Sequence, residues 1–464
     1  MTTRAILCAD VGSTYTKVAA IGLDGVLHAG ATHRTTIDTD VLDGLSAART
    51  IVEQRLPSNV VIDDLRVCSS AGGGLRLGVI GNEPLVTATA AHRAGLSAGS
   101  RVVAVIAGTV TESDMDALAS AAPDVLLVAG GTDGGDETAL LDHATTLAAS
   151  VASRPALRVP VVLAANSHAS EHVAAMLRAA GLAVSVVANV LPLIGQLNPG
   201  PARLALREAF LEHVIVGKNL SDAREFAAMV RSATPDTVLA GVELFADGHG
   251  AVPPSGDVVV VDVGGATTDV YSVLTPDAEL EGPRREVAGT AWRSRTVEGD
   301  LGLRHTAVGI VSAAEAEGLI DPAEVAALGP AAAYRADHPA FLPDTDDQRG
   351  VDLRLTQLAI MVALRRHARG ERYGGPDSPL RGGKDLRAVN LVVGSGGVLR
   401  HHGDAASAML ADAIGADTAG GYPLPDKAKT VIDTSYVLGM AGLLAPDHPE
   451  VALKLMHTHL IAPL

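Results

Sequence analysis

One short pattern occurs twice in this chain of 464 residues. The first copy begins at Asp10 and the second at Asp262. Counted from the aspartate, both copies have Val at the next position, Gly two positions on, Thr six positions on and Val eight positions on. An apolar run precedes each copy and another follows it. Each copy therefore predicts a strand, a tight turn and a second strand, and the repetition predicts a fold built from two similar lobes.

Both turns carry residue types that bind phosphate. Glycine lets the backbone approach a ligand closely, so several N–H groups of one turn can point at a single anion. Small hydroxyl side chains add donors, and an aspartate at a strand end can hold a hydrated metal ion that contacts phosphate. The candidate phosphate-binding residues are Gly12, Ser13, Thr14, Thr16, Gly264, Gly265, Thr267 and Thr268. Two such hairpins, one per lobe, would grip a nucleotide from opposite sides; two unrelated strands ending in ordinary turns are the alternative.

The pattern differs from two widespread nucleotide-binding loops. The chain has no G-x-x-x-x-G-K-[ST] string, which excludes the P-loop. A strand-like run rather than a helical one follows the glycines, which excludes the dinucleotide fingerprint of Rossmann folds. The phosphate-binding elements of this chain are therefore expected to be hairpins.

The composition excludes some classes of protein. The length suggests about two to four domains, and 47% hydrophobic with 19% charged residues is typical of a compact globular chain. Aromatic residues make up only 2%, so the cores are expected to consist of Ala, Val and Leu. The formal net charge of −17 argues against nucleic acid as a partner, because nucleic acid phosphates would be repelled.

The sequence also bears on location. No apolar stretch is long enough to span a membrane, and the short first apolar run, which leads into Asp10, does not fit a signal peptide. Cys8 and Cys68 both lie in apolar surroundings and are expected to be buried thiols in a reducing cytoplasm. Two cysteines cannot hold an iron–sulfur cluster unless a second subunit supplies the other pair.

The order of apolar runs and turns predicts an α/β chain with an insertion. Residues 1–83 are predicted to form the first lobe, to which a C-terminal segment returns, and residues 257–464 the second lobe. Between them, apolar runs alternating with helical patterns predict a parallel α/β domain at residues 84–200. A helical connection is expected at residues 201–256.

Two glycine-rich loops each admit two readings. Residues 69–74 form either another backbone surface near the nucleotide or a plain turn. The loop of residues 130–135 follows a predicted parallel strand, at the end where such sheets bind ligands. There Asp133 and Asp136 would contact a ligand or partner, or would simply begin a helix.

A third glycine turn lies near the C-terminus. The apolar run from Leu391 leads into Gly394, Ser395, Gly396 and Gly397. Glycines here would let the backbone lie flat against a planar base or a ribose. Many strand-to-helix turns look alike, but the position of this one after two Asp-Gly hairpins favours nucleotide binding. The two histidines that follow are expected at the surface.

Two acidic residues follow the second hairpin. Glu298 and Asp300 are candidates for positioning a water molecule or a metal ion, and Glu298 is the catalytic candidate of the pair. Solvated loop carboxylates without a function fit the same pattern.

Two hairpins and a glycine-rich turn, in that order, resemble the actin, Hsp70 and sugar kinase superfamily. The resemblance implies two duplicated ribonuclease-H-like (actin-like ATPase) lobes that close over ATP and Mg²⁺, with the parallel α/β domain inserted. It implies that Asp10 and Asp262 organise Mg²⁺, through water, together with the attacking water molecule. It further implies that Lys17 contacts phosphate and that the glycines of the third turn face adenosine.

A closer resemblance, to the GlmL family, extends over nearly the whole chain. This family is also called MutL of the glutamate mutase locus and is unrelated to the mismatch-repair protein of that name. The motifs that carry it are residues 10–17, 70–75, 130–135, 189–192, 262–272, 296–302 and 383–386. Ser395 and Asp136 depart from the expected Thr and Asn. The resemblance implies an ATP-dependent accessory protein that reactivates or protects an adenosylcobalamin-dependent mutase, glutamate (methylaspartate) mutase or a related aminomutase.

The residues leave other functions open. No D-x-H-x-x-G string is present, so the cobalamin would belong to the mutase subunits that the chain serves. A small-molecule kinase, acting on a sugar or a carboxylic acid, is the main alternative on the same fold and would need a catalytic base such as Asp262, Asp269 or Glu298. An activator of radical dehydratases would need paired cysteines in mid-chain. A homodimer is left open.

Overall fold

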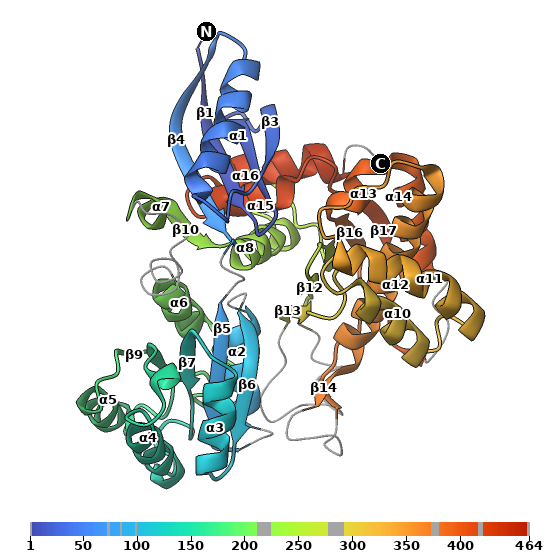
Figure 1. The fold of residues 1–464 in the computed structure, drawn as a ribbon. Helices are drawn as coiled ribbons and strands as arrows, with labels where there is room; N and C mark the ends of the chain where they lie inside the picture. Colours follow the sequence, from blue (N-terminus) through green and yellow to red (C-terminus); the bar gives the residue numbers. More distant parts are fainter. Residues whose placement is uncertain are drawn as a thin grey trace. The chain divides into compact units, whose positions relative to one another are not determined.

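A computed structural model describes residues 2–71, 75–83, 86–97, 100–210, 224–276, 292–372, 380–415 and 421–461 (Figure 1). The chain divides into two compact units. Unit 1 comprises Met1–Leu239, Pro276–Ser294 and Arg372–Pro379, and unit 2 comprises Ala240–Thr275, Arg295–Glu371 and Leu380–Leu464. The division falls inside helix α8 (Thr234–Asp247), which contributes residues to both units.

The first sheet of unit 1 has the strand order β10-β4-β1-β2-β3. Its strands are β1 (Thr3–Val11), β2 (Tyr15–Gly22), β3 (Leu27–Arg34), β4 (Val60–Ser69) and β10 (Val230–Ala233). The first three strands run antiparallel to one another in chain order, whereas β4 lies parallel to β1 and β10 parallel to β4. Helix α1 (Val41–Arg55) starts at Asp40, whose side chain accepts a hydrogen bond from the backbone N–H of Leu42.

Unit 2 repeats this arrangement with the order β13-β12-β11-β16-β17. Its strands are β11 (Val258–Val263), β12 (Thr268–Val273), β13 (Arg293–Glu298), β16 (Leu391–Ser395) and β17 (Lys429–Ile432). As in the first sheet, the second strand is antiparallel to the first, the fourth is parallel to the first and the fifth is parallel to the fourth. The same strand order in both sheets confirms the predicted pair of duplicated ribonuclease-H-like lobes.

Helices surround the sheet of unit 2. They are α10 (Ala307–Ala316), α11 (Pro322–Asp337), α12 (Asp346–Arg369), α13 (Gly397–His401), α14 (Gly403–Gly415), α15 (Val437–Leu444) and α16 (Pro449–Met456). The longest, α12, has Thr345 as its N-cap and ends at Gly370, whose φ of 79° suits glycine. The short strands β14 (Gly370–Arg372) and β15 (Leu380–Gly382) pair with each other.

The inserted domain of unit 1 is a parallel sheet in the order β6-β5-β7-β8-β9. Its strands are β5 (Arg76–Gly81), β6 (Arg101–Ala107), β7 (Val125–Val128), β8 (Val161–Leu163) and β9 (Val184–Val186). Its helices are α2 (Thr87–Ser97), α3 (Glu112–Ser120), α4 (Thr138–Ser150) and α5 (Ser170–Ala179), and α6 (Gly200–Ala209) and α7 (Arg224–Met229) follow. This is the predicted parallel α/β insertion.

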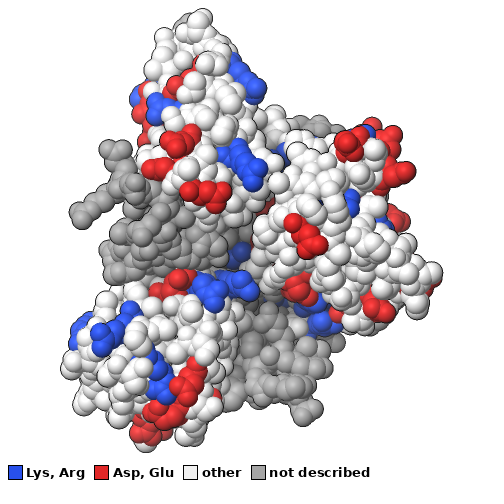
Figure 2. All heavy atoms as spheres, viewed as in Figure 1, with Lys and Arg blue, Asp and Glu red and all other residues white. Residues whose placement is uncertain are grey.

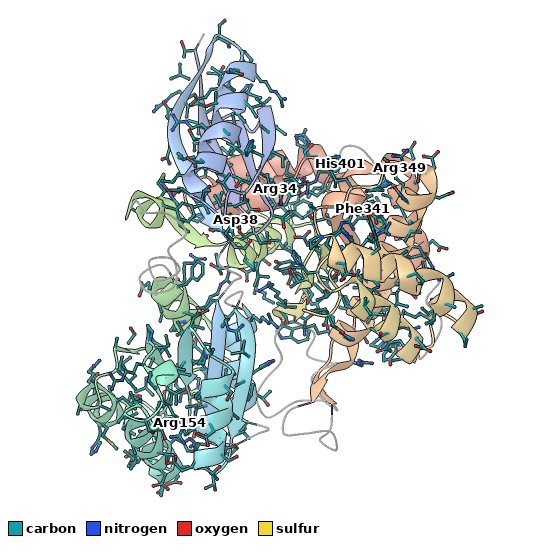
Figure 3. All side chains as sticks on the ribbon, in the orientation of Figure 1. Arg34, Asp38, Arg154, Phe341, Arg349 and His401 are labelled. Carbon is teal, nitrogen blue, oxygen red and sulfur yellow. The ribbon has the colours of Figure 1, made fainter. Side chains whose placement is uncertain are left out.

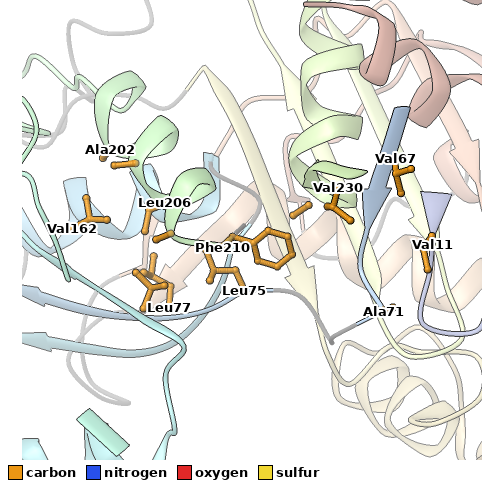
Figure 4. Packing of buried hydrophobic residues seen from close by; sticks show 14 of the residues in the cluster. Val11, Val67, Ala71, Leu75, Leu77, Val162, Ala202, Leu206, Phe210 and Val230 are labelled. Atoms are coloured by element: carbon orange, nitrogen blue, oxygen red, sulfur yellow. The ribbon is translucent and has the colours of Figure 1, made fainter. Parts of the chain in front are cut away.

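Alternate residues of each inserted strand pack on opposite faces. Leu127 belongs to a core that includes residues of α2 and α6, whereas Leu126 and Val128 belong to a core with residues of α3, α4 and α5. Figure 4 shows the first of these cores, with Leu206 and Phe210 beside Leu75 and Leu77. A parallel sheet covered on both faces explains why these strands are continuous apolar runs in the sequence.

The structure places two segments differently from the predicted division. Strand β5 precedes residue 84 but pairs with β6 and β7 of the insertion, so residues 76–81 do not belong to the first lobe's sheet. Strand β10 lies within residues 201–256, which were predicted to be a helical connection, yet it pairs with β4 at the edge of the first sheet. Both strands are short, and the position of their partners decides where they belong.

Charged side chains of both signs are interspersed on the surface that Figure 2 displays. Arg154 of the insertion, labelled in Figure 3, forms ion pairs with Glu112 at 2.6 Å and Asp116 at 2.8 Å. Ion pairs whose carboxylates are exposed in this way contribute little to stability. Within the described ranges, every helix is too short or too polar to cross a lipid bilayer.

A buried histidine makes unit 2 sensitive to pH. His367 of α12 is fully buried, with Nδ1 at 2.9 Å from Thr296 Oγ1 and Nε2 at 2.8 Å from Ser272 Oγ. Burial and then the positive charge of Lys384 lower the pKa of His367 well below its ordinary value. The folded state therefore keeps this imidazole neutral, while the unfolded chain takes up a proton near pH ~6.5.

We expect the unfolding free energy to fall as pH drops below about 6.5, because only the unfolded state gains a proton at this side chain. The expected slope is about 1.4 kcal/mol per pH unit for this one group. Urea unfolding between about pH 7.5 and 5.5 measures it, and His367→Asn should flatten the profile. An unchanged slope in that variant would assign the pH dependence to other groups.

Candidate functional site

The two repeated motifs fold into hairpins with the same register. Asp10 pairs with Lys17 across the first hairpin, and Asp262 pairs with Asp269 across the second. Each turn closes with a hydrogen bond from the glycine N–H to the carbonyl oxygen three residues on: 3.2 Å from Gly12 and 2.9 Å from Gly264. The sequence repeat is therefore a structural repeat down to individual hydrogen bonds.

Both glycines are required by the turn. A Cβ added to Gly12 would lie 2.7 Å from the carbonyl oxygen of Tyr15, and one added to Gly264 would lie 3.1 Å from that of Thr267. Real Cβ atoms seldom approach an oxygen so closely. Gly12 and Gly264 therefore allow the backbone of each hairpin turn to approach itself closely.

Asp10 is held inside unit 1 by several partners. Its side chain is buried, with Oδ1 accepting from Thr234 Oγ1 at 2.5 Å and from Cys68 Sγ at 3.6 Å. Oδ2 lies 3.3 Å from Lys17 Nζ. Burial and then the charge of Asp10 raise the pKa of Cys68 well above its ordinary value, so the thiol is neutral and donates. The Asp10 carboxylate is consequently oriented and its charge is balanced.

Asp262 stands in a different environment. It is half-buried, and in the part of unit 2 that the structure describes its carboxylate forms no hydrogen bond or ion pair. Asp269 faces Asp262 across the hairpin, and burial raises the pKa of its carboxyl. The positive charge of Arg295, at 2.8 Å, opposes this rise, whereas the negative charge of Asp262 adds to it. The second hairpin therefore carries an excess of negative charge around an unpaired carboxylate.

A third carboxylate adds to this excess. Asp433 is buried, and burial raises its pKa against the opposing hydrogen bonds from the N–H groups of Leu438 and Val437. The charge of Asp262 adds to the rise. In the described ranges no group of three or more His, Cys, Asp or Glu side chains is arranged to hold a metal ion directly. The chemistry of these carboxylates fits a hydrated cation.

A loop and a buried ion network brace the second turn. The backbone N–H of Leu303 donates to Gly264 and that of Arg304 to Gly265, at 3.0 and 2.9 Å. The Arg304 guanidinium reaches Asp352 at 2.7 Å, and Arg335 reaches the same carboxylate at 2.6 Å. This network fixes the backbone of the glycine turn from behind.

The same arginine makes a further contact. Arg304 Nε donates to the carbonyl oxygen of Phe341 at 3.1 Å, and the Phe341 ring, labelled in Figure 3, lies 5.2 Å from the Arg335 guanidinium. The Asp352 carboxylate and the carbonyl group and ring of Phe341 thus surround the two arginine side chains. None of these residues was singled out from the sequence, where they are ordinary charged and aromatic positions.

Two of the predicted phosphate-binding hydroxyls face inward. Thr16 Oγ1 is buried and lies 2.9 Å from Thr35 Oγ1, and Thr268 Oγ1 is buried and donates to the carbonyl oxygen of Leu301 at 2.7 Å. Because strand residues alternate between faces, the sixth position of each motif points into the lobe. Ser13 and Thr14 are exposed, whereas Thr267 is half-buried and its hydroxyl donates to Asp269 Oδ2 at 3.3 Å.

The third glycine turn combines packing with one open position. A Cβ on Gly394 would lie 2.9 Å from Leu410 and 3.0 Å from Leu399, and one on Gly396, at φ 119°, would overlap the carbonyl oxygen of Val263. These two glycines allow close packing of α13 and α14 on the sheet. Gly397 is exposed with no described atom within 4 Å of such a Cβ. Ser395 is buried beside Asp262 in the strand register.

The two loop acids after the second hairpin share one arginine. Arg366 Nη1 lies 2.7 Å from Glu298 Oε2 and 2.7 Å from Asp300 Oδ1. Burial opposes ionisation of Asp300, but the hydrogen bonds and charge of Arg366 outweigh it and lower the pKa of that carboxyl. Glu298 is thus ion-paired with a distant arginine that no local sequence pattern indicates, and its catalytic role stays a prediction.

The glycine-rich loop of the insertion is held by two buried amides. Asn166 accepts from the N–H of Gly134 and donates to the carbonyl of Gly135, and Asn189 donates to Gly131 and to Asp133. Asp136 accepts from the N–H and hydroxyl of Thr138 at the start of α4. Of the predicted loop 69–74, residues 72–74 lie outside the described residues.

Comparisons with known proteins match the chain from end to end. A family model described as MutL protein matches residues 6–460. Protein MutL of Clostridium tetanomorphum is 34% identical over 469 residues, an alignment that covers 98% of this chain and 99% of that protein.

Solved structures resemble the chain much more weakly. A ROK family glucokinase from Streptomyces griseus, in complex with glucose and AMPPNP, is 10% identical with a TM-score of 0.33, over 95% of this chain and 97% of that one. Component A of (R)-2-hydroxyglutaryl-CoA dehydratase from Acidaminococcus fermentans is 9% identical with a TM-score of 0.28, over 97% and 96%. Similarity this low supports no conclusion about the fold. The assignment of two duplicated lobes is based on strand order and register alone. The full-length family match and the 34% identical relative, in contrast, show that this chain belongs to the MutL protein family, as its motifs predicted.

Proposed function

We propose that this protein binds and hydrolyses ATP with Mg²⁺, and that it acts as an accessory factor of an adenosylcobalamin-dependent mutase. The observation that carries the first part is the matched pair of hairpins, with equal register and equal turn closure on two sheets of equal strand order. An aspartate stands near the end of the first strand of each hairpin, beside a turn whose N–H groups can bind phosphate.

The two hairpins would divide the chemistry between them. The turn after Asp10 offers backbone N–H groups, the exposed hydroxyls of Ser13 and Thr14, and the Lys17 cation, which suits phosphate oxygens. Asp262, unpaired in the described part of unit 2, suits a hydrated Mg²⁺ or a proton from the attacking water. Bound Mg²⁺ would neutralise part of the negative charge on the phosphates.

The accessory role draws on family membership. The motifs shared with the GlmL family and the full-length match to the MutL model support a partner that is a glutamate (methylaspartate) mutase or a related aminomutase. In this role ATP would bind two arrangements of the lobes with different affinity, because a ligand shifts populations only by its differential affinity. The inserted α/β domain is a candidate for contact with the mutase.

The test is an ATPase assay on the purified full-length chain. We expect phosphate release that requires Mg²⁺, that proceeds without any small acceptor and that increases with an added mutase whose cobalamin has been inactivated. Recovery of mutase activity should require hydrolysable ATP and fail with AMPPNP. Turnover that appears only with a sugar or carboxylic acid, and yields its phosphate ester, would instead establish a kinase.

A further inference from the structure

Helix α8 begins at the residue that contacts Asp10. Thr234 directly follows β10 and is the first residue of α8. Its Oγ1 lies 2.5 Å from Asp10 Oδ1, a contact between residues 224 positions apart in the chain. The same hydroxyl is 3.8 Å from Cys68 Sγ, whose thiol also reaches Asp10 Oδ1. One oxygen of the carboxylate is thus occupied by donors from two neighbouring elements.

We propose that Thr234 is a positioning residue for Asp10, in an inference that rests on the proposed ATPase function. By donating to Oδ1, the hydroxyl turns this oxygen inward and leaves Oδ2 on the side of Lys17 and the hairpin turn. With Oδ1 fixed, the carboxylate has a single orientation, and Oδ2 is the oxygen that would contact metal-bound water. Thr234 therefore contributes to turnover without touching the nucleotide.

The second lobe shows that the fold itself does not require this bond. Asp433 directly follows β17, which occupies in unit 2 the sheet position that β10 occupies in unit 1. Its carboxylate accepts from the N–H groups of Val437 and Leu438, at 2.8 and 3.1 Å. Asp433 thus accepts hydrogen bonds from the first residues of α15. Among the described residues of unit 2, no hydroxyl after β17 donates to Asp262. Within the described chain, a donor to the hairpin aspartate is specific to unit 1.

Another hydroxyl stabilises the start of α8. Thr237, one turn further along, donates to the carbonyl oxygen of Ala233 at 3.1 Å and also bonds to Ser232. Both residues belong to β10, so Thr237 ties the helix to its strand. Asp236, also in this turn, is held by Arg203 at 3.0 Å. The local structure therefore has other supports when the Thr234 hydroxyl is removed.

The experiment compares three variants of the full-length protein. Thr234→Val keeps the shape of the side chain and removes the donor, and Thr234→Ser keeps the donor. Thr237→Val removes a buried hydroxyl of the same turn that bonds to Ser232, Ala233 and Cys68 but not directly to Asp10. Steady-state ATPase rates are measured against both ATP and Mg²⁺ concentration. Thermal unfolding of each variant is measured in parallel.

We expect Thr234→Val to lower kcat about 10- to 100-fold, the range for losing a hydrogen bond to a charged group. The Mg²⁺ concentration for half-maximal rate should rise severalfold, while KM for ATP changes less than about twofold. Thr234→Ser should restore kcat to within about threefold of the original chain. Thr237→Val should lower the unfolding temperature with kcat and the Mg²⁺ dependence retained.

Two outcomes would overturn the inference. One is a Thr234→Val protein with unchanged kcat and unchanged Mg²⁺ dependence. The other is equal losses in Thr234→Val and Thr237→Val that follow their unfolding temperatures, which would make the role of Thr234 structural. Either result requires an active original protein; an original chain that binds and hydrolyses no ATP would refute the proposed function itself.

Discussion

Replacing Asp10 or Asp262 by asparagine is expected to lower ATP turnover about 1,000-fold, which corresponds to a barrier about 4 kcal/mol higher. Each substitution keeps the size of the side chain and removes the negative charge that, in the proposed function, would attract hydrated Mg²⁺. In Asp10→Asn the new amide oxygen would still accept from the Thr234 hydroxyl, so the fold of unit 1 should persist. Phosphate release at saturating Mg·ATP measures the loss.

Matched controls make this result specific. Asp38 in unit 1 and Asp404 in unit 2 are exposed aspartates outside the hairpins, and their asparagine variants should keep full activity. Far-UV circular dichroism should be the same for all four variants. Turnover retained in both Asp10→Asn and Asp262→Asn would refute the chemistry assigned to the hairpins.

Replacing Asp352 by alanine should cause the largest loss of stability among single changes discussed for unit 2. The fully buried Asp352 carboxylate neutralises Arg304 and Arg335, which are themselves largely buried. Removing one member of a buried ion network leaves charge without compensation, at a cost of about 3–5 kcal/mol. Urea unfolding followed by circular dichroism measures this loss.

The control for this prediction lies on the same helix. Asp346 is an exposed aspartate of α12 whose partner is Arg349, and Asp346→Ala should cost under about 1 kcal/mol. Because Arg304 also braces the Gly265 turn, Asp352→Ala should weaken ATP binding under conditions where the protein remains folded. A stability loss equal to that of Asp346→Ala would show that solvent or other groups compensate the two arginines.

The sequence predicts those elements whose signal is local. The hairpins of residues 10 and 262 have apolar strands and glycine turns within a short stretch, and the inserted strands are apolar because helices cover both faces of their sheet. Strand β13 lacks such a signal, since its buried Arg295 pairs with Asp269 of the neighbouring strand. In edge strand β3, exposed residues alternate with buried or half-buried ones only from Ala29 onward, and few of them are apolar and large.

The partners of the site residues could not be predicted in the same way. Thr234 reaches Asp10, and Arg366 reaches Glu298, through contacts between residues far apart in the chain. Such contacts depend on how strands are ordered in a sheet, which no local pattern encodes. The inward direction of Thr16, by contrast, follows from strand alternation and was accessible from the sequence.

The two hairpins differ in one respect that matters for the molecule as a whole. Across from the aspartate, the first has a lysine and the second an acid, Lys17 and Asp269, at the same register position. The two hairpins thus share one sequence motif but have side chains of opposite charge at the position that faces the aspartate. The first hairpin therefore favours an anionic group at this place and the second a cation, so the repeat does not give two equivalent binding surfaces.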